Sequence, residues 1–224
     1  MKHAVIICNG NLSLTKANLN TLIANANLLI AVDAGLKYFS KFNINPDIIL
    51  GDMDSISPNI LNKYKDNNKI KKIFYNKNKD QTDTELAIIQ ALNIGAKKIT
   101  IIAGTGKRVD HTIGNIELLK KYPNIITLME NNTKILVLNN KKKLILKNNY
   151  KNFNNKKNIV SLFSINNPKI TTTNLKYNLN NQELIFPTHG VSNKIALNPA
   201  SISINSGLLI VCANINIDLE IKNK

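Results

Sequence analysis

The chain has no tryptophan, only two cysteines and no long apolar run. No stretch approaches the roughly 18 consecutive apolar residues that a membrane-spanning helix needs, so we expect no membrane partner. Cys8 and Cys212 lie in short apolar runs typical of strands, which favours two buried thiols in a reducing compartment over a disulfide. The apolar N-terminus is short and is followed by Asn9-Gly10-Asn11, without a plausible signal-peptide cleavage site. These absences indicate a cytoplasmic protein.

Acidic residues are also scarce relative to basic ones. The 30 lysines and arginines outnumber the 14 aspartates and glutamates, and the formal net charge is +16. Such a charge can indicate nucleic-acid binding. The lysines, however, are scattered among asparagines and isoleucines, and no aromatic residues interleave the basic runs as a single-strand-binding surface requires. We therefore expect a solvated basic surface and no nucleic-acid partner.

Strand and helix signals alternate regularly in the first half of the chain. Amphipathic stretches, one of which carries Leu86, Ile89 and Leu92 at helical spacing, separate apolar runs that are typical of buried strands. Thr82-Asp83-Thr84-Glu85 forms a capping box, Ser57-Pro58 marks another helix start, and Asp110 is expected to cap the helix that follows it. This alternation predicts a Rossmann-like α/β domain, with a mostly parallel sheet and helices on both faces. The predicted strands are residues 4–8, 28–32, 48–50, 70–75, 99–103 and 125–129.

The pattern changes after about residue 130, where no convincing helical period remains. Polar turns separate closely spaced β-rich segments, which favours a small antiparallel sandwich or barrel. The boundary is placed near Asn131-Asn132, which divides the chain into residues 1–131 and 132–224. The Asn- and Lys-rich stretch 147–158 is interpreted as a loop. The predicted strands are residues 134–138, 144–146, 159–165, 182–186, 200–204 and 208–213.

The most informative motif follows the predicted strand at 48–50. That strand runs directly into Gly51-Asp52-Met53-Asp54, and ligands bind at the carboxyl ends of strands in open α/β sheets. Two carboxylates on one turn can point into the same space, and Mg²⁺ uses such oxygen ligands together with substrate phosphates. A pair of solvated aspartates on a turn is the simpler alternative for this motif taken alone.

Three further loops belong to the same edge of the sheet. One carries Asp80 and Asp83, another carries Gly104 to Arg108, and the loop after residues 28–32 carries Asp33 and Gly35. Glycines allow a close backbone approach to phosphate, and an arginine offers a planar fork for phosphate oxygens. Carboxylates, glycines and an arginine that converge in this way predict metal-assisted transfer of a nucleotide phosphate.

These motifs together resemble the thiamine pyrophosphokinase family. The resemblance is carried by residues 31–35, 45–55, 80–83 and 108–115, and by 175–179 and 190–193 near the C-terminus, so it spans nearly the whole chain. It implies transfer of the pyrophosphoryl group of ATP to the hydroxyl of thiamine, which gives thiamine diphosphate and AMP. It also implies a homodimer with active sites at the subunit interface, an α/β catalytic domain and a C-terminal β-sandwich that binds thiamine.

The resemblance assigns roles to particular residues. It implies that Asp52, Asp54 and Asp83 hold Mg²⁺, and that Asp80, Asp83 and Arg108 are catalytic. Ser192 and Asn193 are expected to belong to the thiamine site. The residues expected to bind the nucleotide or to line its pocket are Asp33, Gly35, Gln81, Thr82, Gly106, Arg108, Asp110, His111 and Asn115.

Two departures from the family pattern accompany the resemblance. Lys107 stands where the family often has glycine before the arginine, and no tryptophan is present to stack on thiamine, so another residue must cover the ring. An aspartyl-nucleophile phosphatase of the haloacid-dehalogenase type is an alternative for Asp52 and Asp54. That family expects threonine or valine two residues after the second aspartate, where this chain has Ile56.

A nucleic-acid-binding module is a second alternative to the thiamine pyrophosphokinase family, and it is suggested by the net charge alone.

Overall fold

The computed structural model describes residues 2–148, 158–186 and 188–224. The chain divides into two compact units. The first contains Met1–Leu118 and Ile125–Asn131, and the second contains Leu119–Asn124 and Asn132–Lys224. The assignment of residues 1–131 to a catalytic domain and of residues 132–224 to a thiamine-binding domain stays a prediction.

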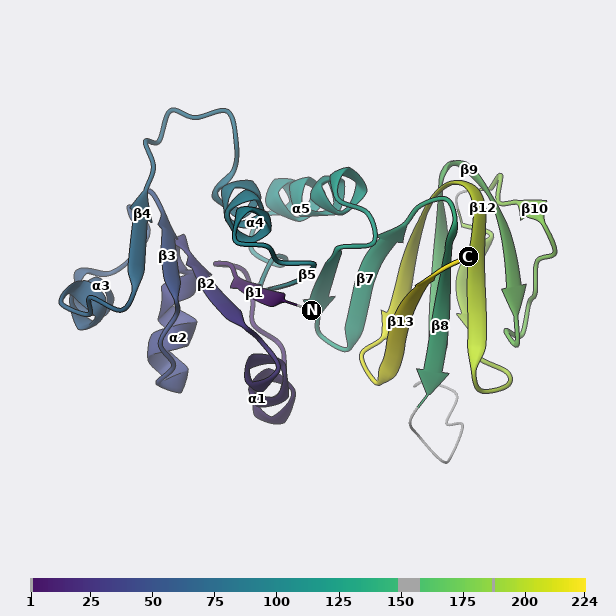
Figure 1. The fold of residues 1–224 in the computed structure, drawn as a ribbon, viewed down its shortest axis with the longest axis horizontal. Helices are drawn as coiled ribbons and strands as arrows, with labels where there is room; N and C mark the ends of the chain where they lie inside the picture. Colours follow the sequence, from purple (N-terminus) through teal and green to yellow (C-terminus); the bar gives the residue numbers. More distant parts are fainter. Residues whose placement is uncertain (1, 149–157, 187) are drawn as a thin grey trace. The chain divides into compact units, whose positions relative to one another are not determined.

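The first unit is built on a parallel sheet whose strands follow the order β6-β5-β1-β2-β3-β4 (Figure 1). The central strand β1 is buried along its whole length, as a strand covered on both faces must be. The parallel α/β architecture is therefore confirmed. The strands are β1 (His3–Ile7), β2 (Leu28–Val32), β3 (Ile48–Gly51), β4 (Lys71–Phe74), β5 (Lys98–Ile102) and β6 (Ile126–Glu130).

One strand of this sheet differs from its prediction. β4 forms where a strand was expected, but the expectation that it is buried is wrong. It lies at the edge of the sheet and pairs with β3 on one side, and 61% of the Phe74 surface is exposed.

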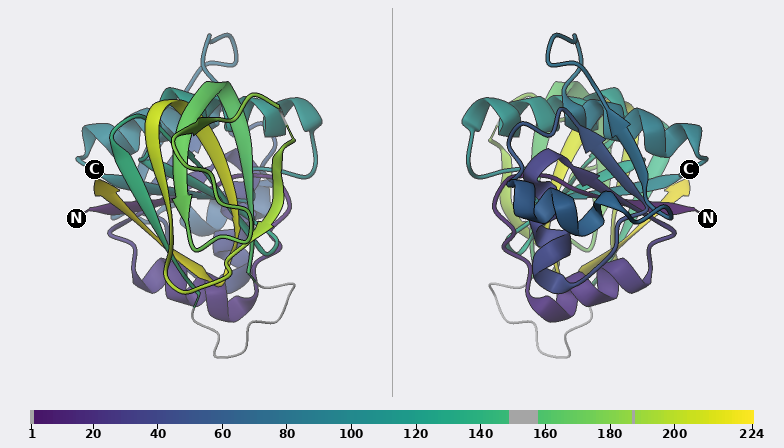
Figure 2. Two further views of the ribbon diagram at one scale, coloured as in Figure 1. Left: turned by 90° about the vertical axis from the view of Figure 1, so that its right-hand side faces the viewer. Right: turned by 90° about the vertical axis from the view of Figure 1, so that its left-hand side faces the viewer.

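Helices cover both faces of the first sheet. α4 lies on one face and α1 and α2 lie on the other (Figures 1 and 2). The helical segments are α1 (Lys16–Ala24), the short 3₁₀ turn η1 (Asp33–Gly35), α2 (Leu36–Phe42), α3 (Pro58–Lys65), α4 (Asp83–Asn93) and α5 (Val109–Lys121). In the described part of the chain, no helix is both long and apolar enough to cross a membrane.

The predicted helix starts are right at two positions and wrong at a third. Thr82 caps α4, where its hydroxyl accepts a hydrogen bond from Glu85 N at 3.2 Å, and Pro58 occupies the first turn of α3. Asp110 does not cap α5, because that helix begins one residue earlier, at Val109. The Asp110 carboxylate pairs with Arg108 instead and also accepts a hydrogen bond from His111 N.

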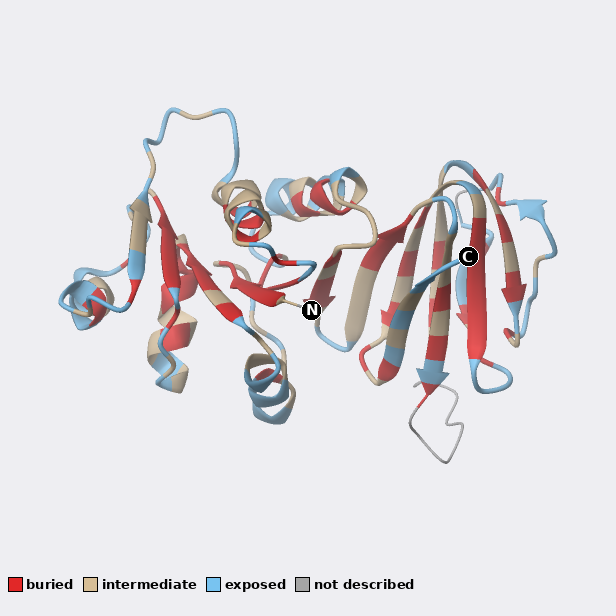
Figure 3. Ribbon diagram, in the orientation of Figure 1, coloured by how far each residue is buried: buried red, intermediate tan, exposed pale blue. Residues whose placement is uncertain are grey.

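The second unit consists of antiparallel strands around an apolar core (Figure 3). Along β12 the pairing partner changes, since residues 200–203 pair with β8 and residues 209–214 pair with β7, while β9 lies along the other edge. The β-rich second domain is therefore confirmed. Its strands are β7 (Thr133–Leu138), β8 (Lys142–Asn148), β9 (Ile159–Thr173), β10 (Gln182–Glu183), β11 (Gly190–Lys194), β12 (Ala200–Asn214) and β13 (Ile217–Asn223).

Several boundaries in this unit were predicted wrongly. The two strands expected at 200–204 and 208–213 form the single strand β12, because a register irregularity around Ser206 and the positive φ of Gly207 are absorbed without ending it. β9 runs on to Thr173, and β11 and β13 were not predicted. The expected loop 147–158 begins within β8, and its residues 149–157 lie outside the described part of the chain.

Candidate active site

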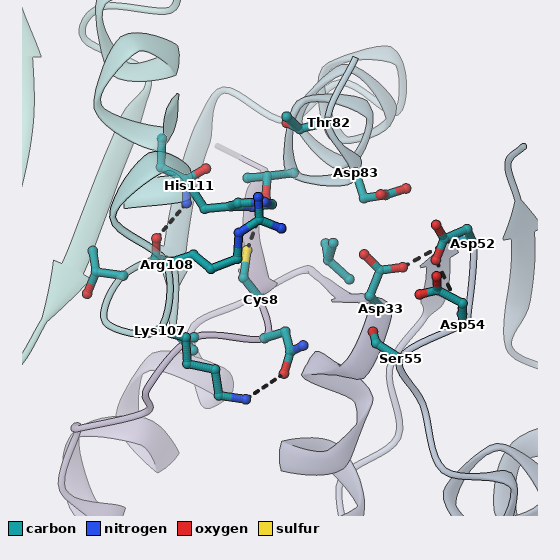
Figure 4. Close-up of a pocket in the computed structure, with 18 residues that line it drawn as sticks. Cys8, Asp33, Asp52, Asp54, Ser55, Thr82, Asp83, Lys107, Arg108 and His111 are labelled. Carbon is teal, nitrogen blue, oxygen red and sulfur yellow. Dashed lines mark hydrogen bonds between the residues drawn. The ribbon is translucent and has the colours of Figure 1, made fainter. Parts of the chain in front are cut away.

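A cavity of about 410 Å³ lies at the carboxyl edge of the first sheet (Figure 4). The loops after β1, β2, β3 and β5 and the N-terminus of α4 all contribute to its lining. The strand order reverses between β1 and β5, and the crevice at such a reversal is where open α/β sheets bind ligands. The predicted site residues in the lining are Asp33, Asp52, Asp54, Thr82, Asp83, Arg108, His111 and Asn115.

Asp33 holds two of the loops together. It begins the turn η1 with a φ of 46°, and its Oδ1 accepts a hydrogen bond from Asp52 N at 3.1 Å. Burial, together with the neighbouring charges of Asp83 and Asp52, raises the pKa of Asp33 to about 7. A side chain on Gly51 would overlap the Asp33 carboxylate, and Gly51 has a φ of 143°. The glycine of the Gly-Asp-Met-Asp motif is therefore required by the contact with Asp33.

Asp52 and Asp54 lie on a tight turn at the end of β3. Met53 between them has a φ of 63°, and Asp54 N donates a hydrogen bond to Asp52 Oδ1 at 3.2 Å. Asp54 is exposed, and its Oδ2 lies 2.6 Å from the ammonium of Lys77, which lowers the pKa of Asp54. The turn thus presents two carboxylates to the cavity, one of them neutralised by a lysine.

Asp83 approaches the same region from the first turn of α4. Its Oδ1 is enclosed and makes no hydrogen bond of regular geometry. The ammonium of Lys79 lies 3.1 Å away, within ion-pair range. An enclosed carboxylate oxygen with such a partner suits a site that is completed by a further positive group.

Positively charged side chains line the other side of the cavity (Figure 4). Arg108 forms a two-point ion pair with Asp110, in which Nε lies 3.1 Å from Oδ1 and an amino nitrogen lies 2.5 Å from Oδ2. This pairing lowers the pKa of Asp110 to about 2. Both side chains are exposed, so Arg108 can exchange this partner for a substrate anion at little cost. Lys107 also lines the cavity, with its ammonium 3.2 Å from Asn9 Oδ1.

Other predicted residues serve the framework around the cavity. Asn115 is buried and donates a hydrogen bond to Gly104 O at 2.6 Å. Gly35 packs so closely on the backbone of β1 that any side chain there would overlap Ile7 O. Gly106 has a φ of 103°, a backbone conformation that glycine adopts more readily than other residues. Gly35, Asp80, Gln81, Gly106 and Asp110 are not among the lining residues.

The two predicted thiamine residues lie on β11 in the second unit. Asn193 is buried, and its amide is used within that unit, since Oδ1 accepts from Tyr177 N at 3.1 Å and Nδ2 donates to Tyr177 O at 2.7 Å. Ser192 is exposed, has a φ of 60° and donates its backbone N–H to Ser161 Oγ. Asn193 therefore shapes the turn around Tyr177, whereas the Ser192 side chain faces solvent.

Sequence reasoning missed the loop after β1. Asn9 and Gly10 line the cavity, and Gly10 N donates to Ala103 O at 2.7 Å. The available signal was that β1 is the first strand of a parallel sheet, so its carboxyl end lies on the same edge as the aspartate loops. Cys8 at that end is a free, buried thiol, and burial raises its pKa to about 12, so it is no nucleophile at neutral pH.

The aspartate oxygens fit Mg²⁺ as a metal shared with a substrate. Among the described residues, no three His, Cys, Asp or Glu side chains are arranged to hold a metal ion by themselves. Mg²⁺ usually takes one or two carboxylates and completes its shell with phosphate oxygens and water. The donor set of hard oxygens, with an enclosed Asp83 Oδ1, suits that mode of binding.

A Rossmann-like sheet with carboxylates on one side of its ligand crevice and Lys107 and Arg108 on the other defines a kinase-type phosphotransferase. Comparison with models of protein families identifies the family within this class. Residues 19–136 match the thiamin pyrophosphokinase catalytic domain, and residues 145–209 match the thiamin pyrophosphokinase vitamin B1 binding domain. The chain belongs to the thiamin pyrophosphokinase family. Thiamine pyrophosphokinase activity, with thiamine and ATP as substrates, follows from this membership.

Individual relatives agree with the family. The chain is 31% identical to thiamine pyrophosphokinase of Bacillus subtilis (strain 168) over 194 residues, which cover 82% of this chain and 86% of that protein. A crystal structure of the B. subtilis enzyme superimposes with a TM-score of 0.82 at 28% identity, covering 95% of this chain and 99% of the other. The fold is also that of thiamin pyrophosphokinase from Candida albicans, with a TM-score of 0.76 at 18% identity and coverage of 98% and 89%.

Proposed function

We propose that the cavity at the carboxyl edge of the first sheet transfers the pyrophosphoryl group of ATP to the hydroxyl of thiamine, giving thiamine diphosphate and AMP. The observation that carries the proposal is the separation of charge within one cavity. Asp33, Asp52, Asp54 and Asp83 lie on one side, and Lys107 and Arg108 lie on the other (Figure 4). A polyphosphate needs cations on both of its flanks, which a metal on the carboxylates and these side chains would supply.

Asp52, Asp54 and Asp83 are the residues that would hold Mg²⁺. Mg²⁺ held there would supply positive charge that stabilises the charge developing on the phosphates during transfer. The chain's own contribution is to position these carboxylates. The Asp33 contact to Asp52 N orders the turn at β3, and the Thr82 cap fixes the start of α4, where Asp83 lies.

The predicted catalytic residues differ in how well the cavity supports them. Arg108 and Asp83 line it, which supports an arginine contact to phosphate and a carboxylate near the reacting groups. Asp80 is exposed on the preceding loop and does not line the cavity, so its catalytic role rests on the family resemblance alone. Gln81, which was predicted to line the nucleotide pocket, is also exposed and outside the cavity lining, so its role likewise rests on the family resemblance alone.

The second unit would supply the contacts to thiamine. Ser192 is exposed next to the turn that Asn193 holds, and Tyr177 on that turn is 62% exposed. The Lys176 ammonium lies 5.1 Å from the centroid of the Tyr177 ring, within the range of a cation–π contact, and a cationic ligand on that face would replace it. Because thiamine is itself cationic, we assign Tyr177 the stacking role that tryptophan has in some family members.

Exposed apolar side chains of the second unit support the homodimer that the family resemblance implies. A soluble monomer rarely exposes many large apolar side chains, and four are exposed between residues 185 and 197. The exposed fractions are 57% for Ile185, 66% for Phe186, 41% for Val191 and 65% for Leu197.

A cytoplasmic location is also proposed. It is supported by the two cysteines, neither of which forms a disulfide.

One assay tests the reaction. The purified protein is incubated with ATP, MgCl₂ and thiamine, and the products are separated by chromatography. We expect AMP and thiamine diphosphate in equal amounts. Formation of ADP or inorganic phosphate with unchanged thiamine would overturn the proposal, and a stable phosphoaspartate on Asp52 would favour the phosphatase alternative. Omitting Mg²⁺ while adding a chelator tests the metal requirement in the same assay.

A further inference from the structure

Two lysines from different elements meet at one amide oxygen beside the cavity. Lys37 of α2 places its ammonium 2.7 Å from Asn9 Oδ1, and Lys107 of the loop after β5 places its ammonium 3.2 Å from the same atom. Lys37 Nζ also lies 3.4 Å from Asn9 O. The proposed function uses Lys107 as one cation beside the polyphosphate, and it assigns no role to Lys37 or Asn9.

This arrangement concentrates positive charge that the protein does not neutralise. Among the described residues, neither Lys37 nor Lys107 forms an ion pair with a carboxylate. Partial burial and the proximity of Lys107 lower the pKa of Lys37 to about 8. The paired ammonium groups repel each other, so an anion placed beside them would relieve an unfavourable interaction as well as form a favourable one.

The platform under the pair is rigid. Gly10 N donates to Ala103 O at 2.7 Å and Asn11 N donates to Thr105 O at 2.9 Å, which ties the loop after β1 to the loop after β5. A side chain on Gly10 would overlap Thr105 O, so the approach of the two loops depends on glycine.

Lys37 is also held by its neighbour. Its ammonium lies 4.7 Å from the centroid of the Tyr38 ring, and the Tyr38 hydroxyl donates to Gly10 O at 2.5 Å. These contacts hold Lys37 in place before any ligand binds, which reduces the entropy that it would lose on binding.

The pair lies at the end of the cavity that the carboxylates do not occupy. Asn9 and Lys107 line the cavity, whereas Lys37 is not among the lining residues and contacts Asn9. Because the Asn9 oxygen accepts from both lysines, its amide N–H groups are left to point elsewhere and can donate to an anion. The Asn9 amide and the Lys107 ammonium make a site for a phosphate oxygen, and the charge of Lys37 lies next to it.

We propose that Lys37, Asn9 and Lys107 form a phosphate clamp that binds the polyphosphate chain of the nucleotide at the end of the cavity opposite the aspartates. The inference rests on the proposed function for the identity of the anion. Lys107 and Asn9 contact the phosphate directly, and Lys37 is a positioning residue that orients the Asn9 amide and adds its charge next to it.

Inorganic tripolyphosphate is the probe that separates the clamp from catalysis. Its binding to the full chain is measured by titration calorimetry without Mg²⁺ or thiamine, so neither metal nor turnover enters the result. We expect Lys107→Met to weaken binding roughly tenfold, because a charged hydrogen-bond donor is lost, and Lys37→Met to weaken it by a smaller factor. The affinity of the double variant for tripolyphosphate should fall by less than the product of the two single-variant factors, because both lysines act through Asn9.

Lys41→Met is the matched control. Lys41 lies on the same helix as Lys37 and is exposed, so this variant removes the same charge from the chain without touching Asn9. Binding by this variant should equal that of the wild type. Circular dichroism confirms that each variant is folded, and Lys107→Arg should restore most of the affinity.

The outcomes separate the clamp from the reaction. Equal tripolyphosphate binding by the wild type and Lys107→Met, or equal weakening by Lys41→Met, would overturn the clamp even if thiamine diphosphate is formed. Weakening confined to Lys37 and Lys107 would support it even if the enzyme assay fails. In the active enzyme, Lys107→Met should raise the KM for ATP about tenfold and leave the KM for thiamine unchanged.

Discussion

Asp33 and Gly51 show how single residues make a ligand crevice out of a sheet edge. The carboxylate of Asp33 reaches the neighbouring strand end and accepts from Asp52 N at 3.1 Å, and it can do so because Gly51 has no side chain. Asp52 and Asp54 are then turned toward the cavity. The placement of these two proposed metal ligands therefore depends on a residue that is not among the proposed ligands.

Asp54→Asn tests the metal assignment. The substitution keeps the size of the side chain and removes its charge, so we expect turnover to fall below about 1% of wild type at saturating Mg²⁺, as is typical when an interaction made in the transition state is lost. Steady-state kinetics over a range of MgCl₂ concentrations measures the effect. Asp66→Asn, at the exposed C-terminal end of α3, is the matched control and should behave as wild type. Near-wild-type turnover of Asp54→Asn would remove Asp54 from the metal shell.

Tyr177→Ala tests the aromatic proposed to cover thiamine. The loss of a cation–π and stacking contact should raise the KM for thiamine by about tenfold and leave the KM for ATP unchanged. Tyr177→Phe keeps the ring and should retain the wild-type value. If Tyr177→Ala binds thiamine normally, or if the KM for ATP rises equally, another residue covers the ring.

At the scale of elements, the loop between β4 and α4 supplies two lysines that form ion pairs with aspartates of the cavity. Lys77 and Lys79, both on this loop, pair with Asp54 and Asp83 at 2.6 Å and 3.1 Å. These lysines occupy the space around the carboxylates that a divalent cation would also seek. The loop and the metal are therefore expected to compete for the same oxygens.

Lys77→Ala tests that competition. Removal of a cation from Asp54 should lower the Mg²⁺ concentration required for half-maximal activity by about two- to fivefold, a modest change because the pair is exposed. The effect should shrink as the salt concentration rises. Lys71→Ala, on the exposed edge of β4, removes the same charge and should leave the Mg²⁺ dependence unchanged. An increased Mg²⁺ requirement in Lys77→Ala would contradict the competition.

At the scale of the whole molecule, the exposed apolar side chains of the second unit predict self-association. We expect a mass near twice the 25.0 kDa of one chain by light scattering coupled to size exclusion. Phe186→Asp should shift the protein toward the monomer, because a charge cannot be buried in an apolar interface without a partner. Phe74→Asp, on the exposed edge strand of the first sheet, is the comparison and should leave the mass unchanged. A wild-type monomer at micromolar concentration would contradict the prediction.

Local patterns predicted the first unit better than the second. Apart from the edge strand β4, its parallel strands are mostly apolar runs, and every strand end in the sheet lies within one residue of the predicted one. In the second unit, the break expected near residues 205–207 was wrong because pairing with β9 on both sides of Gly207 outweighs the local turn signal. β13 was missed because its alternating pattern includes Asp218 and Glu220, and its strand conformation depends on the pairing with β8.

The sequence by itself determined the chemistry of this protein. Three kinds of local feature carried that chemistry: the order of strands and helices, the aspartates at strand ends and the thiamine pyrophosphokinase motifs. Local features of this kind can be identified in the sequence without a structure. Tertiary structure alone decided which of those residues meet. It left Asp80 and Gln81 outside the cavity lining, buried Asn193, and brought Lys37 to Asn9 and Lys107. The physical reason is that a contact between residues 98 positions apart depends on the packing of whole strands and loops, which no short pattern encodes.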